Sequence, residues 1–279
     1  MKRWNLMLAA LGLGMALTLG LAASPALALS LQGNYYTLSS THPDTTGDID
    51  GHTVTGLVLP ALSGTAGTVG AAPVASGTSG PSSGPITDKN GANVILWWTA
   101  HTTLVAADNS VNGGVNNVRT DNFVGGVLGG PGFASGFYPN GNPNDADGFR
   151  AVHWTGTFLV GGGGAHLTLS ADDDAFLFLN GNLAMDNGGV KAIGLAQTTT
   201  ADLAAGSYVV DLFFADRHQT QSGIAFSCEG CLDPVPEPTT LLLFGTTLAG
   251  LGSIVRRRMK TRKDVAVLRA FVFVQKHTE

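Results

Sequence analysis

The residues best suited to chemistry in this chain form an acidic run, Asp172-Asp173-Asp174, just before an apolar segment. Adjacent carboxylates repel one another unless a cation or hydrogen-bond donors compensate their charges. Carboxylate, carbonyl and amide oxygens are the ligands that Ca²⁺ prefers, about six to eight at a time. Downstream, Asp186-Asn187 offers an acid and an amide in a glycine turn, and a hairpin would bring both groups to one end of a sandwich. The pattern therefore indicates a calcium site, with a solvated turn as the simpler alternative.

Other polar residues offer weaker catalytic chemistry. His218 follows an apolar run and could act as a general base, but a structural or exposed histidine is far more common, and the same holds for His153. Arg217 is expected to form a structural ion pair with an aspartate, such as those of the acidic run. The serines lie in low-complexity loops, and the aspartates cluster in turns rather than flanking a cleft, as glycoside hydrolysis requires. We therefore predict that the protein is not an enzyme, with a surface hydrolase acting on polysaccharide as the alternative.

Cys228 and Cys231 are the two cysteines of the chain. Their CxxC spacing also occurs in redox and zinc sites, but no second CxxC and no βαβ pattern accompanies it here. The export signals at the two ends of the chain imply an oxidising compartment. We therefore expect a small local disulfide.

Short apolar runs separated by turn residues dominate the middle of the chain, and helical periodicity is almost absent. Alternating β-branched, aromatic and other apolar residues predict strands, and the Asn-Gly and glycine-rich segments between them predict turns. The predicted strands are 94–98, 158–160, 166–169, 175–179 and 208–214. This pattern is typical of an antiparallel β-sandwich or barrel, so we predict an all-β fold.

Two stretches of the chain look like loops. Residues 63–85 are rich in Gly, Ser, Thr, Ala and Pro, which predicts a flexible excursion with little to bury. Residues 109–144 are rich in Gly and Asn, which predicts long loops with one or two weak strands. The prolines of 233–236 predict an extended linker, because proline restricts both itself and the residue before it.

The N-terminus has the three parts of a secretory signal: a positively charged start, an apolar core over 6–21 and an A-x-A cleavage site that ends at Ala28. We predict a signal peptide over 1–28 and an exported domain over 29–232. Residues 29–235 carry 17 acidic residues against five basic ones, a formal charge of −12, whereas the whole chain has −5. This balance argues against nucleic-acid binding and suits a cation-binding or simply soluble surface protein.

The C-terminal region combines three elements of a membrane-sorting segment. The run of 17 uncharged residues is at the lower limit for crossing a hydrocarbon core at ~1.5 Å rise per residue. A basic cluster after it would stay on the cytoplasmic side, so the preceding residues would face outward. The tripeptide, the predicted transmembrane segment and the basic cluster are Pro236-Glu237-Pro238, 239–255 and Arg256-Arg257-Arg258.

This arrangement, over 233–258, closely resembles the PEP-CTERM sorting signal of Gram-negative bacteria. In that family an exosortase recognises the Pro-Glu-Pro motif and releases or re-anchors the protein outside the inner membrane. The resemblance implies an exosortase as partner, an inner-membrane anchor before processing and a cell-surface or extracellular location after it; a plain C-terminal anchor is the alternative. Residues 259–279 depart from the pattern, which usually stops soon after the basic cluster; we expect them to be a cytoplasmic tail, an extended reading frame or an added sequence.

Several segments of the exported domain follow one another in a recognisable order: 31–36, 41–44, 97–98, 135–139, 170–181, 186–190 and 213–218. By this order the domain resembles PA14-type β-sandwich domains, and among them the fibro-slime branch. The resemblance implies a PA14-like sandwich with long loops. In some lectin-like members an Asp-Asp pair holds Ca²⁺ that ligates sugar hydroxyls. Asp172 and Asp173 would be that pair, with Asp186 and Asn187 as further candidates from spacing alone. Lys191 stands where fibro-slime sequences tend to have histidine, and a cation there weakens the case for a metal.

These observations together predict an exported, non-enzymatic protein of the cell surface or extracellular matrix. Its expected role is that of an adhesive or polysaccharide-associated binding module, with calcium as the cofactor of the lectin-like version.

Overall fold

The computed structural model describes residues 29–45, 48–100, 105–107, 118–123, 127–129, 149–194, 198–218 and 221–232. The chain divides into two units, Met1–Asp233 and Pro234–Glu279, and the described residues all lie in the first. The predicted signal peptide and sorting region lie outside them. Within the described ranges, no helix has the length and apolar character that a membrane crossing needs.

The described residues are mainly strands, as the sequence predicts. A short 3₁₀ turn, η1 (Pro43–Thr45), follows the first strand. In chain order the strands are β1 (Leu29–Leu38), β2 (Ser79–Gly80), β3 (Gly84–Pro85), β4 (Val105–Ala107), β5 (Val118–Phe123), β6 (Val127–Gly129), β7 (Phe149–Val160), β8 (Ala165–Asp172), β9 (Asp174–Leu179), β10 (Asn182–Asn187), β11 (Thr199–Leu203), β12 (Gly206–Ala215), β13 (Gly223–Glu229) and β14 (Cys231–Leu232).

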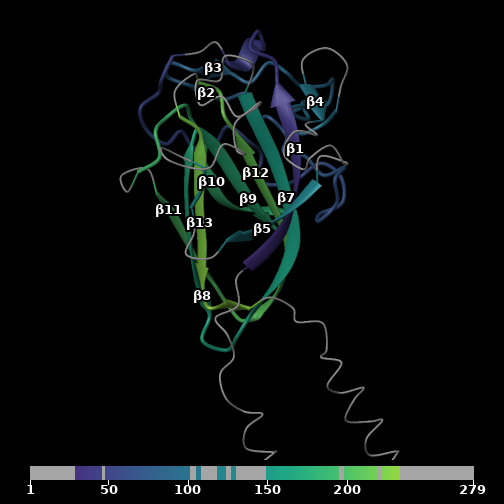
Figure 1. Ribbon diagram of the computed structural model, residues 1–279, viewed down its shortest axis with the longest axis vertical. Helices are drawn as coiled ribbons and strands as arrows, with labels where there is room; N and C mark the ends of the chain where they lie inside the picture. Colours follow the sequence, from purple (N-terminus) through teal and green to yellow (C-terminus); the bar gives the residue numbers. More distant parts are fainter. Residues whose placement is uncertain are drawn as a thin grey trace, which may run out of the picture. The chain divides into compact units, whose positions relative to one another are not determined.

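Two antiparallel sheets form the layers of the domain (Figure 1). The larger sheet has the order β10-β9-β12-β7-β1-β4, with β14 also paired to β7 and β5 to β1. The smaller sheet has the order β11-β8-β13-β6, and β2 and β3 form a separate short pair. Apolar side chains from both sheets join one core cluster. The predicted all-β antiparallel sandwich is therefore confirmed.

Strands β9 and β12 show that both faces of the larger sheet are covered. Successive side chains of a strand point to opposite faces. Leu177 and Leu212 join the core between the two sheets, while their neighbours Phe176 and Phe213 join a second core on the outer face. The near-continuous apolar run 208–214 thus reflects a strand buried on both sides.

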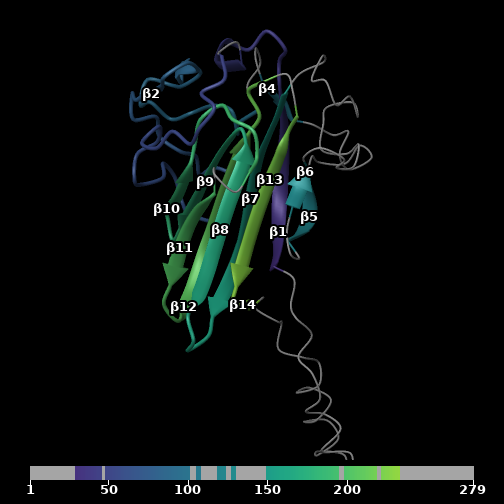
Figure 2. The same cartoon turned by 90° about the vertical axis from the view of Figure 1, so that its left-hand side faces the viewer.

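The second core is closed by residues 48–100, which lie beside β9 and β10 (Figure 2). The Trp98 ring meets the Phe213 ring edge-on, with centroids 5.0 Å apart, and Trp98 Nε1 donates a hydrogen bond to Phe214 O at 2.8 Å. Isolated bridges hold the segment together, among them Ser63–Ala72.

Two predictions for this segment are wrong. Residues 63–85 do bury side chains: Ala71 and Ala72 are each 1% exposed, and Ala72 pairs with Ser63 through backbone hydrogen bonds. The strand predicted over 94–98 reduces to two bridge residues, Val94 and Ile95, and a turn after them inserts the tryptophans into the second core. The burial within 63–85 was missed because its composition is of low complexity. The strand over 94–98 was predicted from apolar composition alone.

The hairpin turn between β9 and β10 is of the Asn-Gly type that the sequence predicts. Asn180 and Gly181 have φ angles of 52° and 80°, in the left-handed region that these two residue types adopt most readily. The resulting register places Ala175 of β9 opposite Asn187 of β10. The end of β10 therefore lies beside the start of β9, next to the acidic run.

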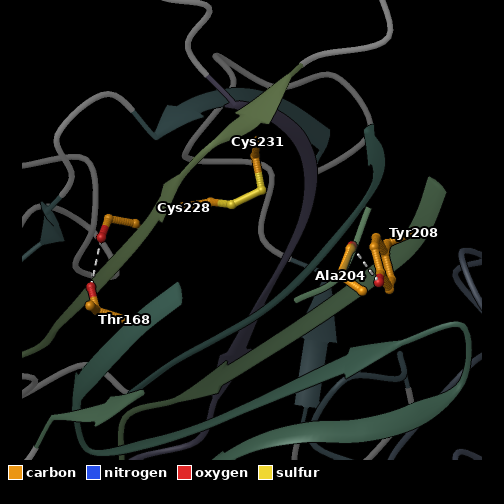
Figure 3. The surroundings of a disulfide bond; sticks show 6 residues. Thr168, Ala204, Tyr208, Cys228 and Cys231 are labelled. Atoms are coloured by element: carbon orange, nitrogen blue, oxygen red, sulfur yellow. Dashed lines mark hydrogen bonds between the residues drawn. A yellow bond between two sulfur atoms is a disulfide. The ribbon is translucent and has the colours of Figure 1, made fainter. Parts of the chain in front are cut away.

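A disulfide joins Cys228 of β13 to Cys231 of β14, with Cα atoms 5.5 Å apart (Figure 3). A hydrogen bond of 2.6 Å between the Thr168 and Ser227 hydroxyls ties β13 to β8 nearby. Because β13 belongs to the smaller sheet and β14 pairs with β7 of the larger one, the disulfide connects the two layers.

Candidate functional site

The acidic run lies where the chain passes from one sheet to the other. Asp172 ends β8 in the smaller sheet, Asp174 begins β9 in the larger, and Asp173 lies between them after a cis peptide bond. The three residues are 2%, 1% and 0% exposed, in chain order. A solvated turn, the simpler alternative from the sequence, is therefore wrong. Buried carboxylates need compensation by nearby donors or cations.

Asp174 is compensated by a buried arginine. Its Oδ2 accepts a hydrogen bond from Arg217 Nε at 2.5 Å, and its Oδ1 accepts one from Gly189 N at 2.6 Å. The Arg217 guanidinium lies 5.2 Å from the centroid of the Trp97 ring. Although burial alone would lower the pKa of Arg217, the charge of Asp174 raises it, so the guanidinium stays charged. The predicted ion pair of Arg217 with the acidic run is present.

Asp173 is held by backbone donors. Its Oδ1 accepts a hydrogen bond from Lys191 N at 2.8 Å, and its Oδ2 accepts one from Arg217 N at 2.7 Å. Complete burial raises the pKa of Asp173, and the charges of Asp172 and Asp174 raise it further. Both carboxylate oxygens are thus engaged by the protein itself.

Lys191 places its ammonium group among backbone carbonyls of the same site. Its Nζ donates to Asp173 O at 2.6 Å, Asn187 O at 2.9 Å and Gly189 O at 3.3 Å, and the residue is 1% exposed. Burial lowers the pKa of Lys191, while the charges of the neighbouring aspartates oppose that shift. Three acceptors match the three donors of an ammonium group. The sequence placed Lys191 at the border of the site but did not indicate this role.

Asp172 is the member of the run that the protein leaves incompletely bonded. It accepts a hydrogen bond from Ile193 N–H, whereas its Oδ2 is buried without a hydrogen-bond partner. Burial raises the pKa of Asp172 to about 7, although the Ile193 bond and the charge of Lys191 lower it. Asp172 also lines a cavity of about 370 Å³. The other residues that line it are Ile49, Gly51, Asp173, Lys191, Ala192, His218 and Gln221.

The hairpin brings the predicted calcium ligands together, but most of their oxygen atoms already have partners. Asp186 accepts hydrogen bonds from Gly56 N at 2.6 Å and Gly188 N at 3.3 Å. Asn187 Oδ1 accepts one from Ala171 N at 3.0 Å, and the Asn187 carbonyl accepts one from Lys191 Nζ.

Among the described residues, no three or more His, Cys, Asp or Glu side chains are grouped as a metal site. Of the carboxylate and amide oxygens predicted to bind calcium, Asp172 Oδ2 is the one that is buried without a hydrogen-bond partner. The donor set as arranged therefore does not fit a calcium ion. Calcium binding by the protein in solution stays a prediction.

A buried aspartate outside the acidic run, Asp44 in η1, supports the site from the outer face. Its Oδ2 accepts hydrogen bonds from Trp97 Nε1 and Asp88 N, each at 2.9 Å, and its Oδ1 accepts one from Thr87 N at 2.8 Å. The Trp97 ring in turn lies under Arg217. The sequence singled out the segments of Asp44, Trp97 and Arg217 as landmarks of the resemblance but did not indicate that they lie together, because the partners of Asp44 lie 43 or more residues further along the chain.

The two histidines considered as catalytic candidates have different surroundings. His153 is fully buried in β7, stacks on Phe213 with centroids 4.1 Å apart, and its Nε2 lies 2.9 Å from Asp211 Oδ1. Burial lowers the pKa of His153, although the hydrogen bond and charge of Asp211 raise it. His153 is structural, as the sequence predicts. His218 lies partly exposed at the cavity beside Asp172.

The C-terminal part of the chain matches the PEP-CTERM protein-sorting motif over residues 234–258. This match agrees with the sorting signal recognised in the sequence. It implies an exported protein that is anchored in the membrane before an exosortase processes it. No curated protein matches the chain.

The solved structures that are similar to parts of the chain include a PA14 domain and a glycoside hydrolase. The PA14 domain of the antifreeze protein MpAFP is 9% identical and covers 77% of this chain and 89% of that domain, with a TM-score of 0.29. The GH31 α-xylosidase from Xanthomonas citri is 18% identical and covers 43% of this chain, which spans 13% of the enzyme, with a TM-score of 0.26. The first is a domain of the type that the sequence resembles.

Proposed function

We propose that this exported, exosortase-sorted protein is a binding module that takes a hydroxyl-rich ligand, such as an extracellular polysaccharide, in the cavity beside Asp172. The observation that carries the proposal is the buried Asp172 Oδ2, which has no hydrogen-bond partner. An unsatisfied buried acceptor costs about 1–3 kcal/mol. Asp172 lines the cavity, and a ligand hydroxyl that displaces the neighbouring atoms enough to reach Oδ2 would donate the missing hydrogen bond.

The cavity has the mixed lining that a sugar requires. His218 and Gln221 supply polar side chains at its border, while Ile49 and Ala192 supply apolar surface for the carbon face of a ring. A volume of about 370 Å³ falls within the ~300–1,000 Å³ common for small-ligand sites. Such a pocket can hold one or two units of a longer chain, which suits adhesion to a matrix polymer.

The same residues favour binding over hydrolysis. A glycoside hydrolase needs two available carboxyl groups, one to protonate the leaving oxygen and one to act as base or nucleophile. Asp172 and Asp173 are the acids that line the cavity, and both oxygens of Asp173 accept backbone hydrogen bonds. Asp173 is therefore unsuited to either catalytic role, and a non-enzymatic surface protein is the function we favour.

Equilibrium binding tests the proposal. The full chain, purified in detergent, is titrated with a panel of bacterial exopolysaccharides and oligosaccharides derived from them. We expect saturable binding that Asp172→Asn weakens at least about tenfold, since one charge-assisted hydrogen bond contributes roughly 1.5–3 kcal/mol. Asp202→Asn makes the same chemical change at an exposed position of β11 and should leave affinity unchanged. Equal affinity of wild type and Asp172→Asn, or release of shortened saccharides, would contradict the proposal.

A further inference from the structure

We propose that Lys191 is an internal cation that takes the place of a metal ion beside the acidic run Asp172-Asp173-Asp174. Three backbone carbonyls converge on its Nζ: one from the β8–β9 junction, Asp173, and two from the turn after β10, Asn187 and Gly189. Backbone carbonyls that converge in this way are ligands of the kind that hard cations take. In this protein the group at the centre of the three carbonyls is the ammonium group of Lys191.

The surrounding charges give this ammonium the electrostatic role of a bound ion. Asp172, Asp173 and Asp174 are buried side by side, and Arg217 pairs with Asp174. Lys191 supplies the second positive charge of the cluster, close to Asp173. Removing a buried cation from such a group leaves an uncompensated carboxylate, which is strongly destabilising. The cluster therefore depends on Lys191 for compensation.

The backbone of the turn is shaped around this occupant. Gly189 has a φ angle of 100°, and a Cβ atom at this position would come within 3.0 Å of neighbouring atoms of His52 and Val54. Glycine is thus required for the conformation that directs its N–H to Asp174 Oδ1 and its carbonyl to Lys191 Nζ. The Gly189 backbone therefore contacts the Asp174 carboxylate and the Lys191 ammonium group at the same time.

A tethered cation differs from a metal ion in one measurable respect: a chelator cannot remove it. The inference goes beyond ligand binding in the cavity, because it concerns what holds the turn together and holds whether or not a saccharide binds. It predicts that calcium does not bind to the carbonyls around Lys191 Nζ in the wild type and does not displace the lysine. It also predicts that shortening Lys191 leaves a vacant cation site there.

The test compares the thermal unfolding of the full-length wild type with that of Lys191→Ala, in EDTA, in millimolar CaCl₂ and in millimolar ethylammonium chloride. We expect the wild-type midpoint to be the same in all three solutions. Lys191→Ala should unfold roughly 10 °C lower in EDTA, and calcium or ethylammonium should restore part of the loss. Lys89→Ala removes a half-buried lysine elsewhere and should show neither effect.

A second measurement on the wild type decides the question if Lys191→Ala does not fold. Lysine acylation followed by mass spectrometry should modify Lys89 and leave Lys191 unmodified, with or without calcium. The proposal is overturned if calcium raises the wild-type midpoint or makes Lys191 reactive. It is also overturned if a folded Lys191→Ala keeps the wild-type midpoint, or if neither cation stabilises it.

Discussion

Lys191 contacts Asp173 twice: its backbone N–H donates to Asp173 Oδ1 at 2.8 Å, and its Nζ donates to the Asp173 carbonyl oxygen at 2.6 Å. One residue thus binds both the side chain and the main chain of the β8–β9 junction. Because this junction connects the two sheets, the contact ties the turn after β10 to the point where the layers meet. The electrostatics of the site and the packing of the sandwich are therefore coupled.

Arg217→Met should lower the free energy of unfolding by about 3–5 kcal/mol, because it leaves the buried Asp174 without its cation. Urea unfolding measures this loss. Asp174→Asn in the Arg217→Met background should restore part of the stability, since it removes the orphaned charge. Equal stability of Arg217→Met and wild type would show that the ion pair contributes little.

Asp172→Asn should weaken saccharide binding and yet raise stability by about 1 kcal/mol or more at pH 8. The reason is that Asp172 Oδ2 is buried without a partner, and a neutral amide is less costly to desolvate than a carboxylate. The two effects are separated by measuring urea unfolding and ligand titration on the same preparation. A variant that loses both stability and binding would indicate a structural role for the carboxylate instead.

The pH dependence of folding should report on His153. Burial lowers its pKa in the folded protein, so between that value and about 6.5 the unfolded chain binds more protons than the folded one. The contribution of His153 to stability is therefore lost as pH falls below about 6.5, at up to about 1.4 kcal/mol per pH unit. Asp172, whose pKa burial raises to about 7, contributes with the opposite sign over the same window and is common to the wild type and the His153 variants. His153→Gln should remove this component from unfolding curves measured between pH 7 and pH 5.

His153→Phe serves as the matched variant for this measurement. It retains an aromatic ring against Phe213 but loses the hydrogen bond to Asp211. Both variants should show the same change in pH slope relative to the wild type, while the phenylalanine variant should be less stable at pH 8. An unchanged slope in either variant would mean that His153 does not control the dependence.

Pro236→Ala combined with Pro238→Ala should prevent processing by the exosortase, because the Pro-Glu-Pro tripeptide lies within the matched sorting motif. We expect the full-length exported chain to remain with the membrane fraction, while the wild type gives a shorter product outside it. Immunoblots of both fractions, in strains with and without exosortase, measure this. Pro234→Ala changes a proline two residues before the tripeptide and should be processed normally, because it leaves the Pro-Glu-Pro sequence intact.

Much of the sheet could be predicted from the sequence. Residues 175–179 and 208–214 are strands as expected, and Asn180-Gly181 forms the predicted turn between β9 and β10. Both could be predicted because the alternation of side chains and the left-handed backbone preference are local properties. The cover formed by residues 48–100 could not be predicted in this way. Its Trp97 and Trp98 pack against Arg217 and Phe213, which lie more than a hundred residues further along the chain.

By itself the sequence determined where the protein is sent and that its exported part is built of strands, since export signals and strand patterns are encoded in contiguous residues. Only the tertiary structure decided what the acidic run does. From the sequence, the run was predicted to bind a metal ion, because its residues are carboxylates and the nearby Asp186 and Asn187 offer further oxygen ligands. In the folded chain those oxygens face Lys191 and Arg217, and Asp172 keeps the unpaired atom. Charge compensation depends on distance in space, which strand pairing sets and residue spacing alone does not.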